Sequence, residues 1–476
     1  MSTAVEQDAR PVVVRPPPHD LYRVLLLRKS GSELLVASKR PPFTLPCVEI
    51  PRWERVAENV IAAVRKRYGL SALCLFTPEL SATTTGGDQP LYQVMETREA
   101  AIGAPDEMRW LPLDSISSQS LADEEDLVAI TNMSRQTAEF QSGEAMGPFG
   151  RPGWIEELSS WVQRAIEPYG LRLSGEFRQL NASPTFALLR LETDGQALWF
   201  KAVGEPNLRE FPISLTLSRL FHGFVPKVIA THPTWHGWLT TEFPGSRLDE
   251  VPDAHAWERA ADTLAELQIA SVGKTDQLLD AGSRDVRVPS LLAFVDPFME
   301  VMSQLMEQQW KTPPPVVNKR ELQTLGKQIK DALSSWAQLH IPDSLGHLDF
   351  NPGNILCSPD QCVFLDWAEA YVGPPFFTLQ YLREHLTRLR HERSSSGADV
   401  VKAYYAKWRR FLSPETISTA LDLAALVAVF AYAAGTAAWR NSTIPEGSRA
   451  AYLRSLTRRM HLEMQGLQQR RHICHD

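Results

Sequence analysis

One stretch limits the fold of this chain more than any other: a polar loop that joins two apolar strands. The loop reads GHLDFNPGN over residues 346–354 and leads into the apolar segment Ile355-Leu356. A second apolar segment, residues 363–365, ends at Asp366. Asp349 and Asn354 stand five residues apart, and Asp366 follows Asn354 after twelve more. Two carboxylates and one amide are therefore carried by a single strand–loop–strand segment.

These three side chains form the set that phosphoryl transfer from ATP requires. One carboxylate orients the attacking hydroxyl and accepts its proton, which is the role predicted for Asp349. An amide oxygen and a second carboxylate hold Mg²⁺ against the phosphates, and these roles fall to Asn354 and Asp366. A solvated turn between two strands is the alternative, and the presence of the whole set makes it the weaker interpretation.

The spacing His-x-Asp-x-x-x-x-Asn matches the catalytic loop of protein kinases. The loop body, with Leu365-Asp366-Trp367 and Gly373-Pro374-Pro375 after it, resembles more closely the aminoglycoside phosphotransferase and choline kinase family, over about residues 150–470. Two positions depart from that family's pattern: Leu348 replaces the usual Gly, and Thr378 stands where an Asp is usual. The resemblance implies an α+β, bilobal protein kinase-like fold with a β-rich small lobe and a helical large lobe.

A phosphate-binding lysine is predicted some 140 residues before the loop. Lys201 lies in the middle of the apolar strand Trp199–Val203, where an unpaired ammonium is costly to bury. Its expected role is to neutralise the α- and β-phosphates, held by the carboxylate of Glu210 at the start of the next helix. A lysine on an edge strand that faces water is the alternative.

The resemblance implies further nucleotide contacts. The turn over residues 180–185, which contains Ser183, lies where a nucleotide-covering loop would sit, and small polar residues there can offer hydroxyl and backbone N–H groups to phosphate. After the strand at 237–241, backbone groups at Glu242 and Phe243 are expected to meet the adenine edge. The implied cofactors are Mg²⁺ and ATP or GTP as the phosphate donor, and the implied partners are a nucleotide and a small hydroxylated substrate.

For other residues near the loop the sequence indicates a role less clearly. His347 is predicted to be structural, with its ring hydrogen-bonded to backbone under the loop. Glu369 either faces the substrate or is a solvated or capping carboxylate, and Gln268 stands where the family carries a His. The acceptor stays open: an arginine-rich C-terminal segment from Arg449 argues mildly against an aminoglycoside, while aromatic residues near Trp367 fit either a choline cage or a core.

Composition excludes several classes of protein. A net charge of −7 and a pI near 6 give no argument for nucleic acid or an anionic membrane as partner. The five cysteines form no C-x-x-C pair, which favours reduced thiols in a cytoplasm, with Cys357 and Cys362 as two buried thiols on a hairpin. The apolar run 423–439 is Ala-rich and short, so a buried helix is expected rather than a membrane span. No signal peptide is visible.

The N-terminal part has a different pattern. A hairpin at residues 22–37 precedes a helix from about Arg55 to Tyr68, which Gly69 closes, and strands follow at 72–76, 91–96 and 108–113, with a turn at 83–88. This order resembles the Nudix fold over about residues 20–135. The metal-binding glutamates of the Nudix box would fall on residues 62–67, which read AAVRKR, so only Glu54 sits at a family position. We predict a Nudix-like α/β sandwich without Nudix hydrolysis, in a ligand-sensing, docking or structural role.

These patterns divide the chain into a disordered arm (1–18), the Nudix-like domain (19–139), a Gly- and Pro-rich linker (140–153), the small lobe (154–245) and the large lobe (246–476). The linker indicates separable cores, with intramolecular contact between the Nudix-like and kinase-like domains left open. The predicted function is a small-molecule O-phosphotransferase that acts on a hydroxyl of a metabolite or antibiotic. The alternative is a kinase-like nucleotide-binding protein with a regulatory or scaffolding role.

Overall fold

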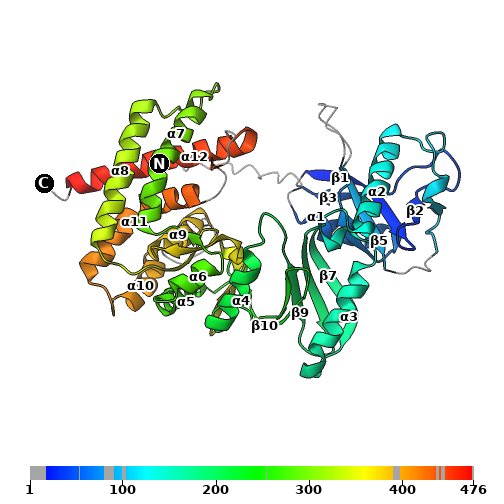
Figure 1. The fold of residues 1–476 in the computed structure, drawn as a ribbon, viewed down its shortest axis with the longest axis horizontal. Coiled ribbons are helices and arrows are strands. Elements are labelled where there is room, and N and C mark those ends of the chain that lie inside the picture. The colour runs from blue at the N-terminus through cyan, green and yellow to red at the C-terminus, as the bar shows by residue number, and fades with distance from the viewer. Residues whose placement is uncertain are drawn as a thin grey trace, which may run out of the picture. The chain divides into compact units, whose positions relative to one another are not determined.

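A computed structural model gives an α+β fold made of two compact units (Figure 1). It describes residues 18–52, 54–79, 91–98, 103–253, 255–389, 397–435, 439–440 and 445–473. Unit 1 comprises residues 1–206 and 229–240, and unit 2 comprises residues 207–228 and 241–476. Residues 1–17 of the predicted arm and the predicted turn at 83–88 lie outside the described residues.

The first sheet of unit 1 has the strand order β4-β5-β1-β2-β6, with β3 also paired to β1. The β1–β5 pair is parallel and the other pairs are antiparallel. The predicted hairpin, the helix closed by Gly69 and the following strands are confirmed, while the Nudix-like identity stays a prediction. The elements are β1 (His19–Arg28), β2 (Glu33–Val36), β3 (Cys47–Pro51), α1 (Val56–Tyr68), β4 (Ala72–Phe76), β5 (Leu91–Thr97), β6 (Arg109–Pro112) and α2 (Glu124–Ser142).

The second sheet of unit 1 has the order β10-β11-β9-β8-β7, and α3 lies along β7 (Figure 1). The predicted strands at residues 199–203 and 237–241 are confirmed as β9 and β11. Alternation of buried and half-buried residues along β8 and β9 gives this sheet one face toward the core. The elements are α3 (Trp154–Ile166), β7 (Leu173–Ser183), β8 (Phe186–Thr193), β9 (Leu198–Ala202), β10 (Val228–Thr231) and β11 (Gly237–Thr241).

Residues 140–153 differ from the predicted linker because they are packed inside unit 1. A short 3₁₀ helix, η2 (Pro148–Gly150), buries Phe149, whose ring centroid lies 5.0 Å from that of Trp154 and 5.4 Å from that of Trp235. Gly147 has a φ of 105° and lies so close to Pro184 that a Cβ would clash. The Gly and Pro residues here therefore permit close backbone approach rather than flexibility.

The two sheets of unit 1 also share a core, where the sequence predicts separable ones. The buried side chain of Gln179 on β7 accepts a hydrogen bond from Cys74 N at 2.8 Å and donates one to Cys74 O at 3.0 Å. These two bonds join the Gln179 side chain to the backbone of β4 in the way that a neighbouring strand would. One cluster of buried apolar residues joins members of both sheets, among them Leu25, Leu75 and Phe200. The sequence did not predict this shared core, because the side chains that form it lie far apart along the chain.

Unit 2 is mainly helical, with two small sheets ordered β12-β15-β16 and β13-β17-β14. Figure 1 shows α12 crossing α7 and α8. The bounds are α4 (Glu210–Leu220), β12 (Ser246–Arg247), α5 (Ala256–Ser271), α6 (Thr275–Asp280), β13 (Arg284–Asp285), α7 (Val288–Glu307), α8 (Lys319–Gln338), β14 (Ser344–His347), β15 (Ile355–Cys357), β16 (Cys362–Phe364), β17 (Ala370–Gly373), α9 (Phe376–Leu389), α10 (Gly397–Trp408), α11 (Pro414–Gly435) and α12 (Gly447–Ile473).

The apolar run 423–439 lies mostly in α11, whose side chains are largely buried among the other helices of unit 2. The predicted buried helix is thus confirmed. Within the part of the chain that the structure describes, α11 is the one helix long and apolar enough to cross a membrane, a property shared by core helices.

The prediction of two reduced thiols at Cys357 and Cys362 is wrong. The register of β15 and β16 places these residues opposite each other, with Cα atoms 4.3 Å apart, and a disulfide joins them. A cross-strand pair at the end of a short hairpin has the separation that a disulfide needs.

Glu96 at the end of β5 links the first sheet to α3. Its carboxylate accepts a hydrogen bond of 2.8 Å from Gly153 N, at the start of α3. Burial raises the pKa of Glu96 to about 7, although the bond from Gly153 opposes the shift. The folded chain therefore binds this proton more tightly than the unfolded chain does.

Replacing Glu96 by Gln should stabilise the protein at alkaline pH. The stabilisation that the Glu96 proton contributes is complete below pH 4.5 and is lost as pH rises through about 7. Gln keeps an acceptor for Gly153 N, so we expect Glu96→Gln to exceed wild type by on the order of 1–3 kcal/mol at pH 8 and to match it at pH 4. Urea unfolding from pH 4 to 8 measures this, with the exposed Glu167→Gln as control. Parallel curves for wild type and Glu96→Gln would contradict it.

Candidate functional site

The predicted loop lies in unit 2 between the two small sheets. The chain leaves one sheet at His347, the last residue of β14, and enters the other at Ile355, the first residue of β15. β15 and β16 form a hairpin, and Asp366 follows β16 after one further residue. Apolar residues at Leu345, Ile355 and Phe364 are buried in the core of unit 2, which anchors both ends of the loop.

The imidazole of His347 is fully buried and joins both sides of this loop. Its Nδ1 accepts a hydrogen bond from Asp349 N at 3.1 Å, and its Nε2 lies 3.1 Å from Leu365 O. Because Nδ1 is an acceptor, the neutral ring carries its proton on Nε2 and donates it to Leu365 O. Burial lowers the pKa of His347, which keeps the ring neutral. The structural role predicted for His347 is confirmed.

The three predicted polar residues of the loop lie together. Asn354 Nδ2 donates to Asp349 O at 3.0 Å, and Leu365 N donates to Asn354 O at 2.9 Å, so Asn354 is bonded to the chain on either side. Asn351 Nδ2 donates to Asp349 Oδ1 at 3.1 Å and orients that carboxylate. Asp366 has a φ of 62° and a ψ of 56°, a left-handed conformation that is uncommon for non-glycine residues and in which Asp is enriched.

This arrangement fits the ligand set of Mg²⁺. The amide nitrogen of Asn354 donates to Asp349 O, so Asn354 Oδ1 could bind a metal, and Asp366 would add a carboxylate. Both are oxygen donors of the kind that Mg²⁺ prefers, and nucleotide phosphates and water would complete its shell. In the described parts of the chain, no group of three or more His, Cys, Asp or Glu side chains is placed to hold a metal by itself.

The two departures from the family's pattern have structural partners. Thr378 on α9 is fully buried, and its Oγ1 accepts a hydrogen bond from His347 N at 3.0 Å and lies 3.0 Å from Tyr371 Oη. Leu348 is buried against α11, where a Cβ placed on Gly435 would lie 3.1 Å from Leu348 Cδ1. A larger residue in the loop thus meets a glycine in the helix, and a hydroxyl supports the loop at position 378.

Gln268 and Glu369 are also bonded within unit 2. Gln268 is buried, donates to Pro375 O at 2.8 Å and accepts from Tyr404 Oη at 2.6 Å. Glu369 forms an ion pair of 2.7 Å with Arg284, and its carbonyl accepts a hydrogen bond from Leu348 N. Arg284 was not among the predicted site residues, because 85 residues separate it from Glu369 and no local pattern marks it.

The predicted nucleotide contacts are divided between the two units. Lys201 and Ser183 belong to unit 1, while Glu210, Glu242 and Phe243 belong to unit 2. Lys201 is half-buried on β9, with its Nζ 5.9 Å from the ring centroids of Phe186 and Trp238.

The remaining residues predicted to contact the nucleotide lie at turns and at the ends of helices and strands. Ser183 Oγ accepts a hydrogen bond from Phe186 N at 3.0 Å and closes the β7–β8 turn. Glu210 is buried at the start of α4, and the half-buried Glu242 and Phe243 follow β11. The Lys201–Glu210 pair stays a prediction.

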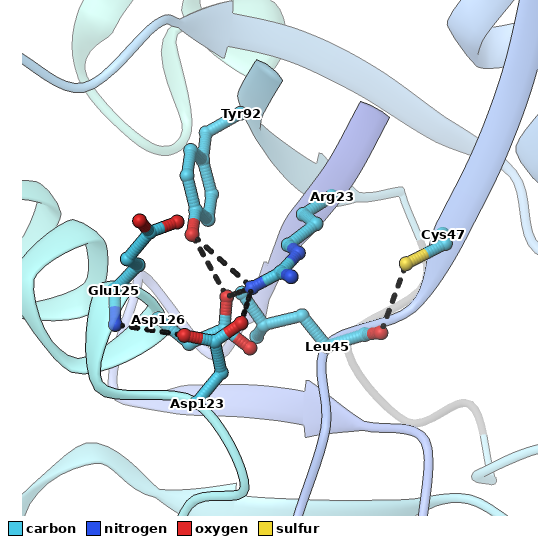
Figure 2. A network of polar contacts seen from close by, with 7 residues as sticks. All are labelled: Arg23, Leu45, Cys47, Tyr92, Asp123, Glu125 and Asp126. Atoms are coloured by element: carbon cyan, nitrogen blue, oxygen red, sulfur yellow. Dashed lines mark hydrogen bonds and ion pairs between the residues drawn. The ribbon is translucent and has the colours of Figure 1, made fainter. Parts of the chain in front are cut away.

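A second polar cluster lies in the first sheet of unit 1 (Figure 2). Arg23 on β1 contacts Asp123 Oδ2 at 2.6 Å and Asp126 Oδ1 at 2.5 Å, and Tyr92 Oη donates to Asp126 at 2.9 Å. The hydrogen bond from Arg23 lowers the pKa of Asp123. Because one guanidinium serves both carboxylates, this cluster is an internal ion-pair network.

A comparison with models of protein families finds one match, in the mainly helical part of the chain. Residues 208–413 match the model of the phosphotransferase enzyme family, a segment that contains Asp349, Asn354 and Asp366. Residues 208–413 are therefore similar to that family. The match makes the chain a phosphotransferase that uses a hydroxyl group as acceptor. It covers less than half of the chain and begins after Lys201.

Several solved structures are similar to this chain. A choline/ethanolamine kinase family protein from Mesorhizobium loti is 13% identical over 61% of this chain and 93% of its own, with a TM-score of 0.40. Plasmodium vivax ethanolamine kinase is 12% identical over 73% and 92%, with a TM-score of 0.42.

A spectinomycin phosphotransferase in complex with ADP and spectinomycin is 12% identical over 65% of this chain and 98% of its own, with a TM-score of 0.38. No curated protein sequence matches the chain. These TM-scores are all low, so the chemistry of the chain is inferred from residues 208–413 and the loop that they contain.

Thr378→Val should weaken the loop of the phosphotransferase domain. Val keeps the shape of Thr but leaves His347 N–H buried without an acceptor, which costs about 1–3 kcal/mol. Thr378→Ser retains the hydroxyl and should recover the larger part of this loss. Chemical unfolding of both variants measures the effect, with the exposed Thr387→Val as control. Equal stability of Thr378→Val and wild type would show that Thr378 does not support the loop.

Proposed function

We propose that this chain is a small-molecule O-phosphotransferase that moves the γ-phosphate of ATP or GTP to a hydroxyl of a small metabolite or antibiotic. The observation that carries the proposal is the loop of the phosphotransferase domain. His347 and Asn354 bond the backbone of Asp349 and Leu365 together, so the carboxylates of Asp349 and Asp366 project from one fixed segment.

In the proposed reaction, the acceptor hydroxyl oxygen attacks the γ-phosphorus and forms a new P–O ester bond. The bond between the γ-phosphorus and the β–γ bridging oxygen breaks, and the nucleoside diphosphate leaves. Asp349 orients the hydroxyl and accepts its proton, while Asn351 holds the Asp349 carboxylate in place. Positioning and charge supply most of the catalysis in such reactions, so little other reactive chemistry is needed.

The other residues hold the nucleotide. Asn354 and Asp366 would bind Mg²⁺, which neutralises charge on the phosphates when it is bound. Lys201, paired with Glu210, would contact the α- and β-phosphates, Ser183 would lie over them, and backbone groups of Glu242 and Phe243 would meet the base. These assignments belong to a proposed bilobal protein kinase-like fold with a Nudix-like N-terminal domain, acting in the cytoplasm.

A nucleotide-binding regulatory or scaffolding protein is the second candidate. It is favoured by the departures from the family's pattern at Leu348, Thr378 and Gln268. All three residues, however, are buried and packed or hydrogen-bonded, so they do not leave the loop unsupported.

Asp349→Asn should separate these candidates. The amide cannot accept the hydroxyl proton, so we expect phosphoryl transfer to fall by a factor of about 10²–10⁴, with nucleotide binding kept. ADP release with Mg²⁺-ATP and a panel of hydroxylated metabolites and antibiotics measures the first, and thermal stabilisation by ADP measures the second. The matched control is Asp360→Asn, the same change at an exposed aspartate of the β15–β16 hairpin. Wild-type protein that ADP stabilises but that transfers no phosphate would support the scaffolding candidate.

A further inference from the structure

The chemical class of the acceptor can be inferred from what surrounds Asp349 within unit 2, and this inference rests on the proposed function. The C-terminal end of α11 lies directly against the loop, because Gly435 packs on Leu348. On the loop's other side, Leu348 N donates to Glu369 O at 3.0 Å. The residue next to Asp349 is therefore in contact with both the end of α11 and Glu369.

Two arginines meet at this end of α11. Arg284 donates from Nη1 to Gly435 O at 2.9 Å and from Nη2 to Glu369 Oε1 at 2.7 Å. Arg440 donates from Nη2 to the preceding carbonyl, Ala434 O, at 3.2 Å. Because the two carbonyls are consecutive, the two guanidinium groups lie close to each other beside the loop.

Arg284, Arg440 and Glu369 together carry a net positive charge. Glu369 neutralises Arg284, but Arg440 is exposed and has no carboxylate partner among the residues that the structure describes. Its guanidinium lies 4.0 Å from the ring centroid of Phe294. Partial burial of the guanidinium, and then the positive charges of Arg284 and Arg209, lower the pKa of Arg440. An anion here would therefore relieve repulsion between like charges.

Helix capping accounts for only part of this arrangement. Cations at the C-terminal end of a helix are stabilising, and each arginine makes one bond to a terminal carbonyl of α11. A guanidinium has five N–H donors, however, and the described residues accept one hydrogen bond from Arg440. Arg284 Nε and Glu369 Oε2 are buried without a hydrogen-bond partner among the described residues, which is uncommon away from functional sites.

The same end of α11 carries an aromatic group. Tyr432 stands one turn before Gly435 on α11, and its hydroxyl lies 3.1 Å from that of Tyr452 on α12. Burial raises the pKa of Tyr432, and the hydrogen bond and charge of Tyr452, followed by the carboxylates of Asp349 and Glu369, add to the shift. Its ring packs against the rings of Tyr381 and Tyr452.

We propose that the acceptor is a small hydroxylated molecule that carries an anionic group, a carboxylate or a phosphate ester. The anionic group pairs with Arg440, next to Arg284, and the reacting hydroxyl faces Asp349. Transfer yields the phosphate ester of this anion and ADP, and the hydroxyl proton passes to Asp349. A polycationic aminoglycoside is disfavoured, because its ammonium groups would approach two guanidinium groups.

The test uses the full-length protein, Mg²⁺-ATP and acceptors matched in all but charge. The pairs are D-glycerate with glycerol, gluconate with sorbitol, and glucose 1-phosphate with methyl α-D-glucoside, while kanamycin and choline serve as cations. ADP release gives kcat and KM, and thermal stabilisation of the Mg²⁺-ADP complex by each acceptor gives binding without turnover. Wild type is compared with Arg440→Gln, and with Arg410→Gln as a matched control at an exposed arginine after α10.

We expect an anionic member to be preferred over its neutral partner. Arg440→Gln should raise the KM of the anionic acceptor about tenfold or more, since it removes a charge-assisted contact, and should leave the KM for ATP unchanged. Arg410→Gln should behave as wild type. Preference for kanamycin, choline or the neutral members, or an unchanged acceptor KM in Arg440→Gln, would overturn the inference.

The outcomes also separate the two proposals. If ADP binds but no anionic acceptor is bound or phosphorylated, the inference about the acceptor is wrong. If wild-type protein binds no nucleotide, the proposed function fails, and the acceptor inference fails with it.

Discussion

The candidate site depends on one buried imidazole. His347 accepts a hydrogen bond from the backbone of Asp349 and donates one to the carbonyl of Leu365, the residue before Asp366. Because the ring is buried and kept neutral, these bonds are not exchanged with water. The spacing between the two carboxylates is thus set by a rigid group and not by the flexibility of the loop.

The surroundings of His347 show how a loop can tolerate unusual residues. Thr378 accepts the His347 backbone N–H, and Tyr371 bonds the same hydroxyl, so no buried donor is left without a partner there. Leu348 fills space that the absence of a side chain at Gly435 leaves open. Each departure from the family's pattern is matched by a residue far away in the sequence, which supports a functional loop rather than a decayed one.

Local features were predictable from the sequence because the interactions that make them are local. The helix before Gly69, the strands around Lys201 and the strand–loop–strand segment at Asp349 each follow from patterns over a few residues. Interactions at long range were not predictable. The Gln179–Cys74 hydrogen bonds span 105 residues, and they turn two predicted cores into one.

The same reasoning explains the errors at the site. Arg284 and Glu369 meet only after folding, so neither residue type nor spacing marks the pair. The Cys357–Cys362 disulfide was missed for another reason: composition argued for a reducing compartment, whereas the strand register decides which thiols face each other. The Gly and Pro residues at 140–153 resemble a linker in sequence but serve close packing around Phe149.

The central claim is that Asn354 and Asp366 form a metal site next to Asp349, and binding of Mn²⁺ in place of Mg²⁺ tests it most directly. Electron paramagnetic resonance of the full-length protein, titrated with Mn²⁺ in the presence of ADP, counts the bound ions without any need for an acceptor. The account predicts nucleotide-dependent Mn²⁺ binding that Asp366→Ala abolishes and that Asp349→Ala retains. Mn²⁺ binding that is absent in wild type, or unchanged in Asp366→Ala, would contradict it.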